Sequence, residues 1–266
     1  IGNLGDMTFR AVEELKAAQL IACEDTRVTR VLLDRYGIAA KTMAYHEHNA
    51  AEMRPKLLAR LREGAVVALV TDAGTPCISD PGYKLVRDVV AAGIPVTSLP
   101  GPCAAITALT LAGLPTDRFF FQGFLPPKQA ARIKILQELQ RIPATLVFYE
   151  SPSRLEASLA DMRSVLGNRE ASVARELTKK FEEIRRDTLS SLCAHYEAQG
   201  APKGEIVIAV APPAESGAVA EAEVEALLRA RIGALSVKEA VAEVASTTGM
   251  PRAQVYALAL KIKDGL

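Results

Sequence analysis

The sequence is poor in several features that would otherwise suggest a function. It has no tryptophan, and only 5% of its 266 residues are aromatic. An extended RNA-binding surface built from stacked aromatic side chains is therefore not expected. No apolar stretch is long enough to cross a membrane, and no signal peptide is recognisable. We therefore expect no membrane partner and a cytoplasmic location.

The sequence also has few cysteines and almost no net charge. The four cysteines contain no CxxC pair, so we expect them to be reduced and expect no bound metal; they are Cys23, Cys77, Cys103 and Cys193. The net charge is +1, with 32 basic against 31 acidic residues. No overall field draws such a chain to nucleic acid, so an RNA partner would have to be held by a local patch.

What the sequence does have is a run of turn-forming residues from Asp72 to Gly82, DAGTPCISDPG. It follows an apolar, strand-like segment (66–70) and precedes a helix-like one (83–92). Two glycines, two prolines and two aspartates make a rigid loop that exposes backbone groups. Because ligands of open α/β sheets bind just outside the carboxyl ends of the strands, this run favours a ligand loop over an ordinary turn.

Residues 1–6 and 100–105 form two similar glycine-bearing loops before helix-like segments. None of the three carries the Gly-Lys-Ser/Thr ending of a P-loop or a GxGxxG with an acidic partner. The ligand therefore need not be a polyphosphate. A backbone-lined pocket near Asp72 suits a zwitterion with hydroxyl groups and a cationic centre.

Strand-like and helix-like segments alternate in the first half, which predicts a parallel sheet covered on both faces. The expected strands are 20–23, 42–45, 66–70 and 96–99, and the expected helices are 9–17, 28–36, 52–63, 83–92 and 103–112. Since Ile1 falls in a loop that a strand should precede, we also expect a first strand before it. The run GLPTD at 113–117 interrupts the pattern and predicts a domain boundary.

The second part predicts a mixed sheet. The expected strands are 119–121, 145–149, 171–174, 182–186 and 206–210, with 172–175 and 182–186 paired antiparallel, and the expected helices are 129–141, 155–166 and 189–199. A linker at 212–217 precedes three helix-like runs, 224–231, 237–246 and 252–263. The fold class is thus α/β, with two α/β domains (1–117 and 118–211) and a small helical C-terminal domain (219–266).

The C-terminal domain has a helix-turn-helix outline, because Gly249-Met250-Pro251 separates its last two helices. Ser236 and Glu239 fit a capping box. The domain holds six basic and six acidic residues, so a helical appendage is favoured over a nucleic-acid module. Residues 118–211 hold 14 basic and 11 acidic residues, including two basic runs, which leaves RNA binding open there.

Seven motifs in order together resemble one family: IGNLGD (1–6), EDTR (24–27), YHEHN (45–49), the 72–82 loop, PGP (100–102), FYESP (148–152) and ARELTK (174–179). The chain is similar to the ribosomal RNA methyltransferases of the S-adenosylmethionine-dependent tetrapyrrole methylase superfamily, closely over residues 1–211. The resemblance implies two α/β domains with S-adenosylmethionine between them, in a homodimer. It also implies 2′-O-methylation of a cytidine in 16S rRNA of the small ribosomal subunit, near the decoding centre.

The resemblance also implies the residues of the methyl-donor site. These are Leu4, Asp72, Gly74, Thr75, Ile78, Cys103, Ala104 and Tyr149. The chain departs from the family pattern at two positions, where Ser153 and Val28 stand in place of histidines. These departures argue against a mechanism that needs a histidine base at either position.

Two side chains are candidates for the chemistry of methyl transfer to a hydroxyl group. Lys179 could take the proton, if its pKa is depressed, or steady the oxyanion; alternatively it is a surface lysine. Glu150 could be a base or a ribose ligand, or a helix-capping partner. Arg154 could grip phosphate or only pair with Glu150.

Asp25, Arg27 and His46 complete the candidate substrate contacts. Asp25 follows a strand, where it fits substrate contact or a helix cap. His46 and His48 share one side of an extended segment, but a metal would need a third ligand, so substrate contact or loop structure is favoured.

Two other functions stay open at this point. One is methylation of a small tetrapyrrole-type molecule, as in relatives of the superfamily. The other is a non-catalytic RNA-binding assembly factor that has kept the fold.

Overall fold

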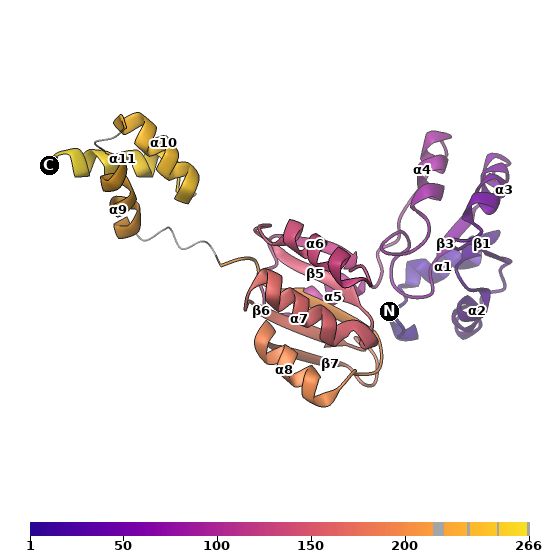
Figure 1. Cartoon of the computed structure of the whole chain (residues 1–266). Coiled ribbons are helices and arrows are strands. Elements are labelled where there is room, and N and C mark those ends of the chain that lie inside the picture. The colour runs from indigo at the N-terminus through magenta and orange to yellow at the C-terminus, as the bar shows by residue number, and fades with distance from the viewer. Residues whose placement is uncertain (215–220, 233–234, 249, 265–266) are drawn as a thin grey trace. The chain divides into compact units, whose positions relative to one another are not determined.

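The fold of the first 117 residues is built on a short parallel sheet (Figure 1). The computed structural model describes residues 1–214, 221–232, 235–248 and 250–264. The sheet order is β2-β1-β3, with both neighbours parallel to the central strand. Its strands are β1 (Leu20–Cys23), β2 (Thr42–Ala44) and β3 (Val67–Val70); the helical elements are η1 (Leu4–Asp6), α1 (Phe9–Ala17), α2 (Thr26–Arg35), α3 (Ala50–Arg62), α4 (Tyr83–Ala91) and α5 (Ala104–Leu111).

Apolar side chains cover both faces of this sheet, as the sequence predicts. Ile21 and Cys23 of β1 pack in a cluster with Leu15 of α1 and Leu33 of α2. The alternate residues of β1, Leu20 and Ala22, pack on the other face with side chains of α3 and α4. All four β1 residues are buried, because side chains of a strand alternate between faces and both faces are covered.

The expected strand at 96–99 is wrong. These residues adopt no regular structure, and the Val96 side chain is 49% exposed. Prolines stand at 95, 100 and 102, where each removes an N–H donor and restricts the residue before it. An apolar, β-branched run becomes a strand only if a neighbouring strand pairs with it.

The second sheet is mixed, as predicted. Its order is β4-β5-β8-β6-β7, in which only β4 and β5 are parallel. The strands are β4 (Phe119–Phe124), β5 (Thr145–Glu150), β6 (Glu170–Arg175), β7 (Glu183–Thr188) and β8 (Ile206–Val210); the helices are α6 (Gln129–Leu139), η2 (Pro152–Arg154), α7 (Leu155–Leu166) and α8 (Leu189–Gln199). The antiparallel pairing of β6 with β7 is confirmed.

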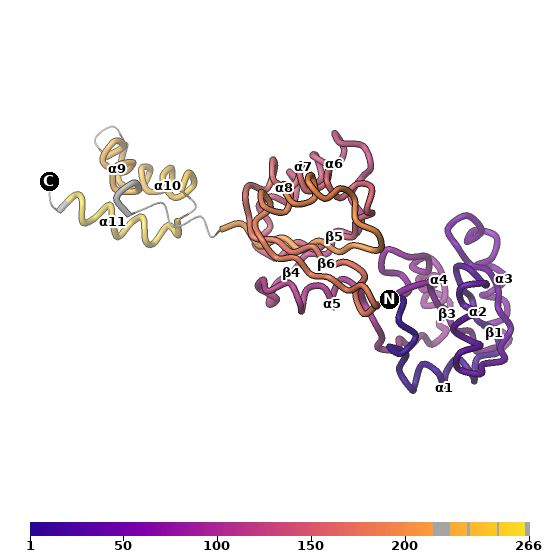
Figure 2. The backbone as a smooth tube through the Cα atoms, turned by 90° about the horizontal axis from the view of Figure 1, so that it is seen from below, coloured from indigo at the N-terminus to yellow at the C-terminus, as the bar shows by residue number. Residues whose placement is uncertain are grey.

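Helices lie on both faces of this second sheet. Helices α6, α7 and α8 cover one face around a large apolar core that includes Leu136, Leu159 and Leu192 (Figure 2). On the other face lies α5, whose residues Ala105 and Leu109 pack with residues of β5, β6 and β8. Because α5 packs on the second sheet, the C-terminal end of the loop before α5 is fixed to that sheet.

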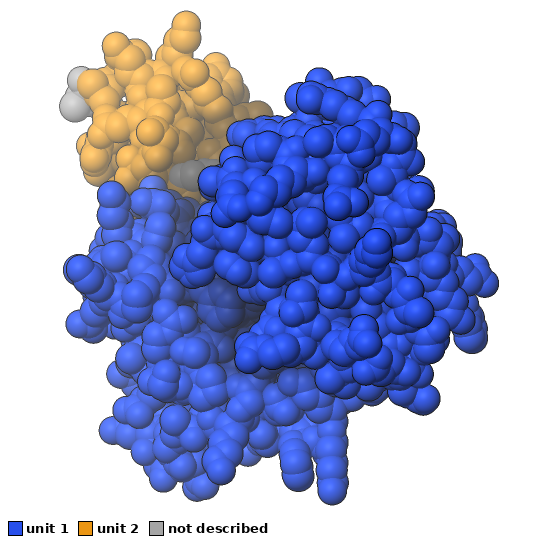
Figure 3. Space-filling view, turned by 90° about the vertical axis from the view of Figure 1, so that its right-hand side faces the viewer, with its two compact units in different colours: residues 1–211 blue, residues 212–266 orange. Residues whose placement is uncertain are grey.

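Residues 212–266 form a separate unit, coloured apart from residues 1–211 in Figure 3. Helices α9 (Glu221–Arg231), α10 (Val237–Thr248) and α11 (Arg252–Asp264) surround their own apolar core. The capping box is confirmed, because the Ser236 N–H donates to Glu239 and the Glu239 N–H donates to the Ser236 hydroxyl. The expected linker at 212–217 and the turn glycine at 249 fall partly or wholly outside the described residues.

Candidate functional site

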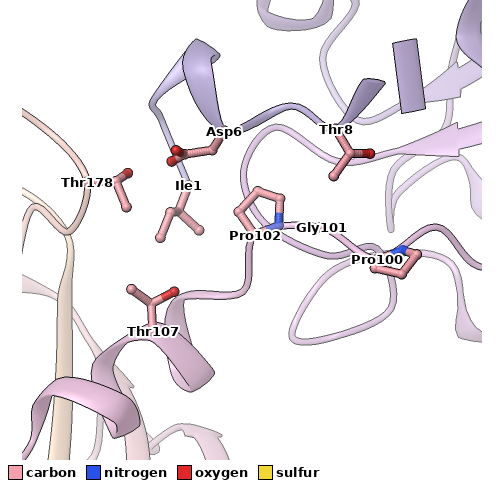
Figure 4. Close-up of a pocket in the computed structure, with 8 residues that line it drawn as sticks. All are labelled: Ile1, Asp6, Thr8, Pro100, Gly101, Pro102, Thr107 and Thr178. Atoms are coloured by element: carbon pink, nitrogen blue, oxygen red, sulfur yellow. The ribbon is translucent and has the colours of Figure 1, made fainter. Parts of the chain in front are cut away.

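Four segments from three distant parts of the sequence meet around one cavity of about 440 Å³ (Figure 4). They are the N-terminal loop, the loop at 100–102, the first turns of α5 and the turn after β6. The lining residues are Ile1, Asp6, Thr8, Pro100, Gly101, Pro102, Thr107 and Thr178. Two of the three glycine-bearing loops singled out in the sequence thus line the same space.

The third loop, at 72–82, is hydrogen-bonded to a residue of the cavity lining. The Thr75 hydroxyl donates to the Pro102 carbonyl over 3.1 Å. Gly74 has a φ of 84°, and a Cβ built there would lie 3.7 Å from Ile1 Cγ2. Cys77 and Ser79 also have positive φ, a conformation that costs energy in non-glycine residues and often marks a functional loop.

Two residues that line the cavity carry polar atoms without hydrogen-bond partners. Within the described residues, the Asp6 Oδ2 and Thr178 Oγ1 atoms are buried and accept or donate no hydrogen bond. In Figure 4 both side chains lie close to Ile1, above Thr107. Buried polar atoms are normally paired, so these two atoms indicate a polar ligand in the cavity.

None of the residues expected to hold the donor is in the lining of this cavity; they lie in η1, in the 72–82 loop, at the start of α5 and in β5. Leu4 is in η1, where its carbonyl accepts from the Tyr36 hydroxyl. Asp72 accepts from the Asp25 N–H over 3.1 Å, which ties the ends of β3 and β1 together. Ile78, in the 72–82 loop, is 41% exposed.

Tyr149 links the second sheet to the start of α5. The Ala105 N–H donates to its hydroxyl oxygen over 3.2 Å. Burial raises the pKa of Tyr149 to about 12, and nearby Cys103 acts in the same direction. Cys103 and Ala104 mark the start of α5, and the Cys103 carbonyl accepts from the hydroxyl of Thr107, which lines the cavity.

Lys179 is held as a cation beside the N-terminal loop. Burial alone would lower its pKa, but hydrogen bonds to Glu205 and Glu176, each 2.9 Å long, outweigh burial and raise the pKa. A Cβ at Gly2 would lie 2.4 Å from Lys179 Cε, and the φ of 90° at Gly2 also favours glycine, so the loop passes close to this lysine. The raised pKa favours the charged form, which stabilisation of an oxyanion needs, over a lysine base.

Glu150 and Arg154 form an internal pair. Glu150 is 3% exposed; its Oε1 accepts from the Ser151 N–H, and its Oε2 accepts from the Ser158 hydroxyl. Arg154 lies 2.7 Å from the same carboxylate and also donates to the Leu125 carbonyl. Because internal donors already occupy both oxygens, this geometry favours an anchoring role for Glu150 over a base.

The remaining candidates lie near the carboxyl end of β1, away from the lining. Asp25 caps α2 and pairs with Arg27 at 2.6 Å; this partner lowers the pKa of Asp25 to about 2. Arg27 itself is 89% exposed. The His46 ring lies 6.0 Å from that of His48, and the described residues contain no group of three potential metal ligands.

One carboxylate was missed by the sequence reasoning. Burial raises the pKa of Asp80 to about 6, and the charges of Glu24 and Asp72 act in the same direction. The nearby Thr71 hydroxyl partly opposes this shift. The sequence shows two aspartates in this loop, but it does not show that one of them is partly buried.

Two family models match the chain. The model described as "Tetrapyrrole (Corrin/Porphyrin) Methylases" matches residues 1–193, and "RsmI C-terminal HTH domain" matches residues 218–263. A ribosomal RNA small subunit methyltransferase I of Mesorhizobium japonicum is 52% identical over 265 residues, 99% of this chain and 90% of the relative. A protein of the same name from Escherichia coli O157:H7 is 48% identical, covering 98% of this chain and 92% of its own length.

Solved structures with the same fold are more distant in sequence. A cobalt precorrin-4 methyltransferase superimposes with a TM-score of 0.58 at 18% identity, over 78% of this chain and 90% of its own. A uroporphyrin-III C-methyltransferase from Thermus thermophilus, complexed with S-adenosyl homocysteine, superimposes with a TM-score of 0.52 at 21% identity, over 77% of this chain and 91% of its own. The chain belongs to the tetrapyrrole methylase family, among the proteins named ribosomal RNA small subunit methyltransferase I.

Proposed function

We propose that this chain transfers the methyl group of S-adenosylmethionine to the 2′-hydroxyl of a cytidine in 16S rRNA near the decoding centre. The observation that carries the proposal is the similarity, at 48–52% identity over nearly the whole chain, to proteins named ribosomal RNA small subunit methyltransferase I. The cavity and its loops supply a site of suitable chemistry. The ribosomal substrate would place the protein in the cytoplasm.

The cavity fits the methyl donor. S-adenosylmethionine carries ribose hydroxyls, an amino acid group and a cationic sulfonium, and it supplies an electrophilic methyl group. The unpaired Asp6 carboxylate oxygen can accept from hydroxyl or ammonium groups, and the unpaired Thr178 hydroxyl can donate or accept. The loops bearing Gly74 and Gly101 bring bare backbone to the same place, with the other expected donor residues around them.

Methyl transfer to a ribose oxygen forms one C–O bond and breaks one C–S bond, and the hydroxyl proton must leave. This chain has to align the two reactants and stabilise the developing alkoxide. Lys179 is a fixed cation beside the N-terminal loop, and its pKa keeps it charged at neutral pH. The proton passes to solvent or to a carboxylate with a raised pKa, of which Asp80 is the one on the ligand loop.

Asp25, Arg27, His46 and Arg154 are proposed to contact the RNA substrate around this centre. Arg27 is exposed enough to reach a phosphate, while Arg154 would have to give up its bond to Glu150. Two copies of the chain are proposed to form a homodimer, which light scattering would test. None of the helices in the described ranges is long and apolar enough to cross a membrane.

One rival function has its own support, since the solved structures of the same fold include methyltransferases named for tetrapyrrole substrates. Incubation with labelled S-adenosylmethionine and either small ribosomal subunits or a porphyrinogen separates the two. We expect label in 16S rRNA, at a cytidine resistant to alkaline cleavage because its 2′-oxygen is blocked. Label only on the porphyrinogen refutes the RNA assignment, and no label on either substrate supports a non-catalytic protein.

A further inference from the structure

The turn between β6 and β7 presents an aromatic ring to solvent. Phe181 is 65% exposed, although the sequence has only seven phenylalanines and no tryptophan. The Lys180 ammonium lies 5.6 Å from the centre of this ring, within the range of a cation–π contact. An aromatic ring and a cation therefore occur together at one exposed point.

The backbone of this turn is fixed. Glu176 and Thr178 have φ values of 51° and 64°, in the left-handed region that non-glycine residues rarely adopt. The Thr178 N–H donates to the Glu182 carboxylate over 2.6 Å, and the Glu182 N–H donates to the Lys179 carbonyl over 3.1 Å. Strained backbone that is held by its surroundings is typical of functional positions.

The turn is also bound to the candidate site. Thr178 lines the cavity, and its carbonyl accepts from Asn3 Nδ2 over 2.8 Å. Lys179 faces inward to Glu176 and Glu205. Phe181 follows Thr178 by only three residues, so the fixed backbone that carries its ring lies close to the cavity.

We propose that Phe181, with Lys180, forms a platform on which a base of the substrate RNA stacks next to the ribose that receives the methyl group. This inference depends on the proposed RNA substrate. Stacking suits the position, because every base has a π-face and a rigid ring loses little freedom on binding. The ammonium of Lys180 can at the same time meet a neighbouring phosphate. The low aromatic content excludes an extended stacking surface but not one ring.

The absence of tryptophan permits a direct test. The F181W variant carries a single indole, whose fluorescence is quenched when a nucleobase stacks on it. We expect saturable quenching with small ribosomal subunits in the presence of S-adenosyl homocysteine. The matched control is F9W, because Phe9 is 92% exposed on α1 and does not line the cavity. Equal quenching in both variants, or none in F181W, overturns the platform.

Kinetics provide the second readout. F181A should raise the KM for ribosomal subunits on the order of tenfold with kcat changed less than about twofold, and F181Y should restore the KM. Calorimetric affinity for S-adenosyl homocysteine and the Tm should match those of the unmodified protein. Loss of donor affinity instead assigns Phe181 a structural role and overturns the platform, as does an unchanged KM.

The same assays separate this inference from the proposed function. If the unmodified protein methylates 16S rRNA while F181A and F181W behave like their controls, the function stands and the platform is refuted. If the unmodified protein methylates no RNA, the function is refuted and the platform with it. Concentration-dependent fluorescence of F181W without RNA assigns the ring to contact between copies of the chain, which also refutes the platform.

Discussion

Replacing Lys179 by methionine tests the role of the fixed cation. The side chain is 24% exposed and makes two hydrogen bonds of 2.9 Å, to Glu176 and Glu205. Glu205 is largely exposed, so its bond contributes little; the bond to Glu176 is better shielded. Together we expect K179M to lower the free energy of unfolding by about 1–2 kcal/mol, well short of what unfolds a protein of this size.

The effect on catalysis should be larger. Removing one donor that stabilises a developing oxyanion costs roughly 10²–10³ in kcat, or about 2.7–4 kcal/mol. We therefore expect kcat to fall by at least about 100-fold in K179M, while the affinity for S-adenosyl homocysteine changes little. K180M, which alters the next lysine along the turn, is the matched control for kcat; it affects the KM for RNA only.

The pH dependence separates the cation from a base. Because the folded pKa of Lys179 is raised, the lysine stays charged below about pH 10.5, and its ion pairs are lost only as pH rises past that value or falls low enough to protonate Glu176. If Lys179 acted as a base, kcat of the unmodified enzyme would rise between pH 7 and 9, and K179M would lose this rise. We therefore expect no rise in kcat over this range that depends on Lys179. Such a rise would mean that Lys179 works deprotonated, and it would refute the oxyanion role.

Three further predictions concern stability, measured by thermal and denaturant unfolding. The pKa of Asp80, about 6, means that this group binds more protons in the folded protein than in the unfolded chain between pH 4 and 6; its contribution to stability falls as pH rises through this range, so D80N should gain stability relative to the unmodified protein as pH rises, by about 1 kcal/mol at pH 7 after allowance for partial exposure. D161A should cost about 3–5 kcal/mol because it leaves Arg132, buried and paired at 2.7 Å, without its partner, whereas K56A in an exposed pair should cost under about 0.5. S236A should cost the C-terminal unit about 1 kcal/mol by removing the capping box. An unchanged unfolding curve for D161A, or a difference in stability between D80N and the unmodified protein that does not change between pH 4 and 7, would contradict these interpretations.

The elements that the sequence predicted best are those with a clear pattern and a clear end. Helices α1, α7 and α8 and strand β8 have the expected bounds, because apolar periodicity is bounded there by caps, glycines or prolines. The run at 96–99 has the same apolar character as β3 but no partner strand. Pairing is a property of the tertiary structure, which a local pattern does not contain.

The site was predictable as a set of loops but not as a set of contacts. The turn-forming residues at 1–6, 72–82 and 100–105 do come together, through the Thr75–Pro102 hydrogen bond and the approach of Gly74 to Ile1, although only the 72–82 loop follows a parallel strand. The partners of Lys179 were not readable, because Glu205 lies 26 residues away and is brought close by the pairing of β6 with β8. The burial that raises the pKa of Asp80 also depends on the packed loop.

Titration calorimetry with S-adenosylmethionine tests the central claim that the converging loops hold the methyl donor. A folded sample, verified by a cooperative thermal transition, should give saturable heat with one donor per chain, and D6A should weaken the affinity by roughly tenfold or more because Asp6 lines the cavity with an unpaired oxygen. No heat with S-adenosylmethionine or S-adenosyl homocysteine from such a sample would contradict the account.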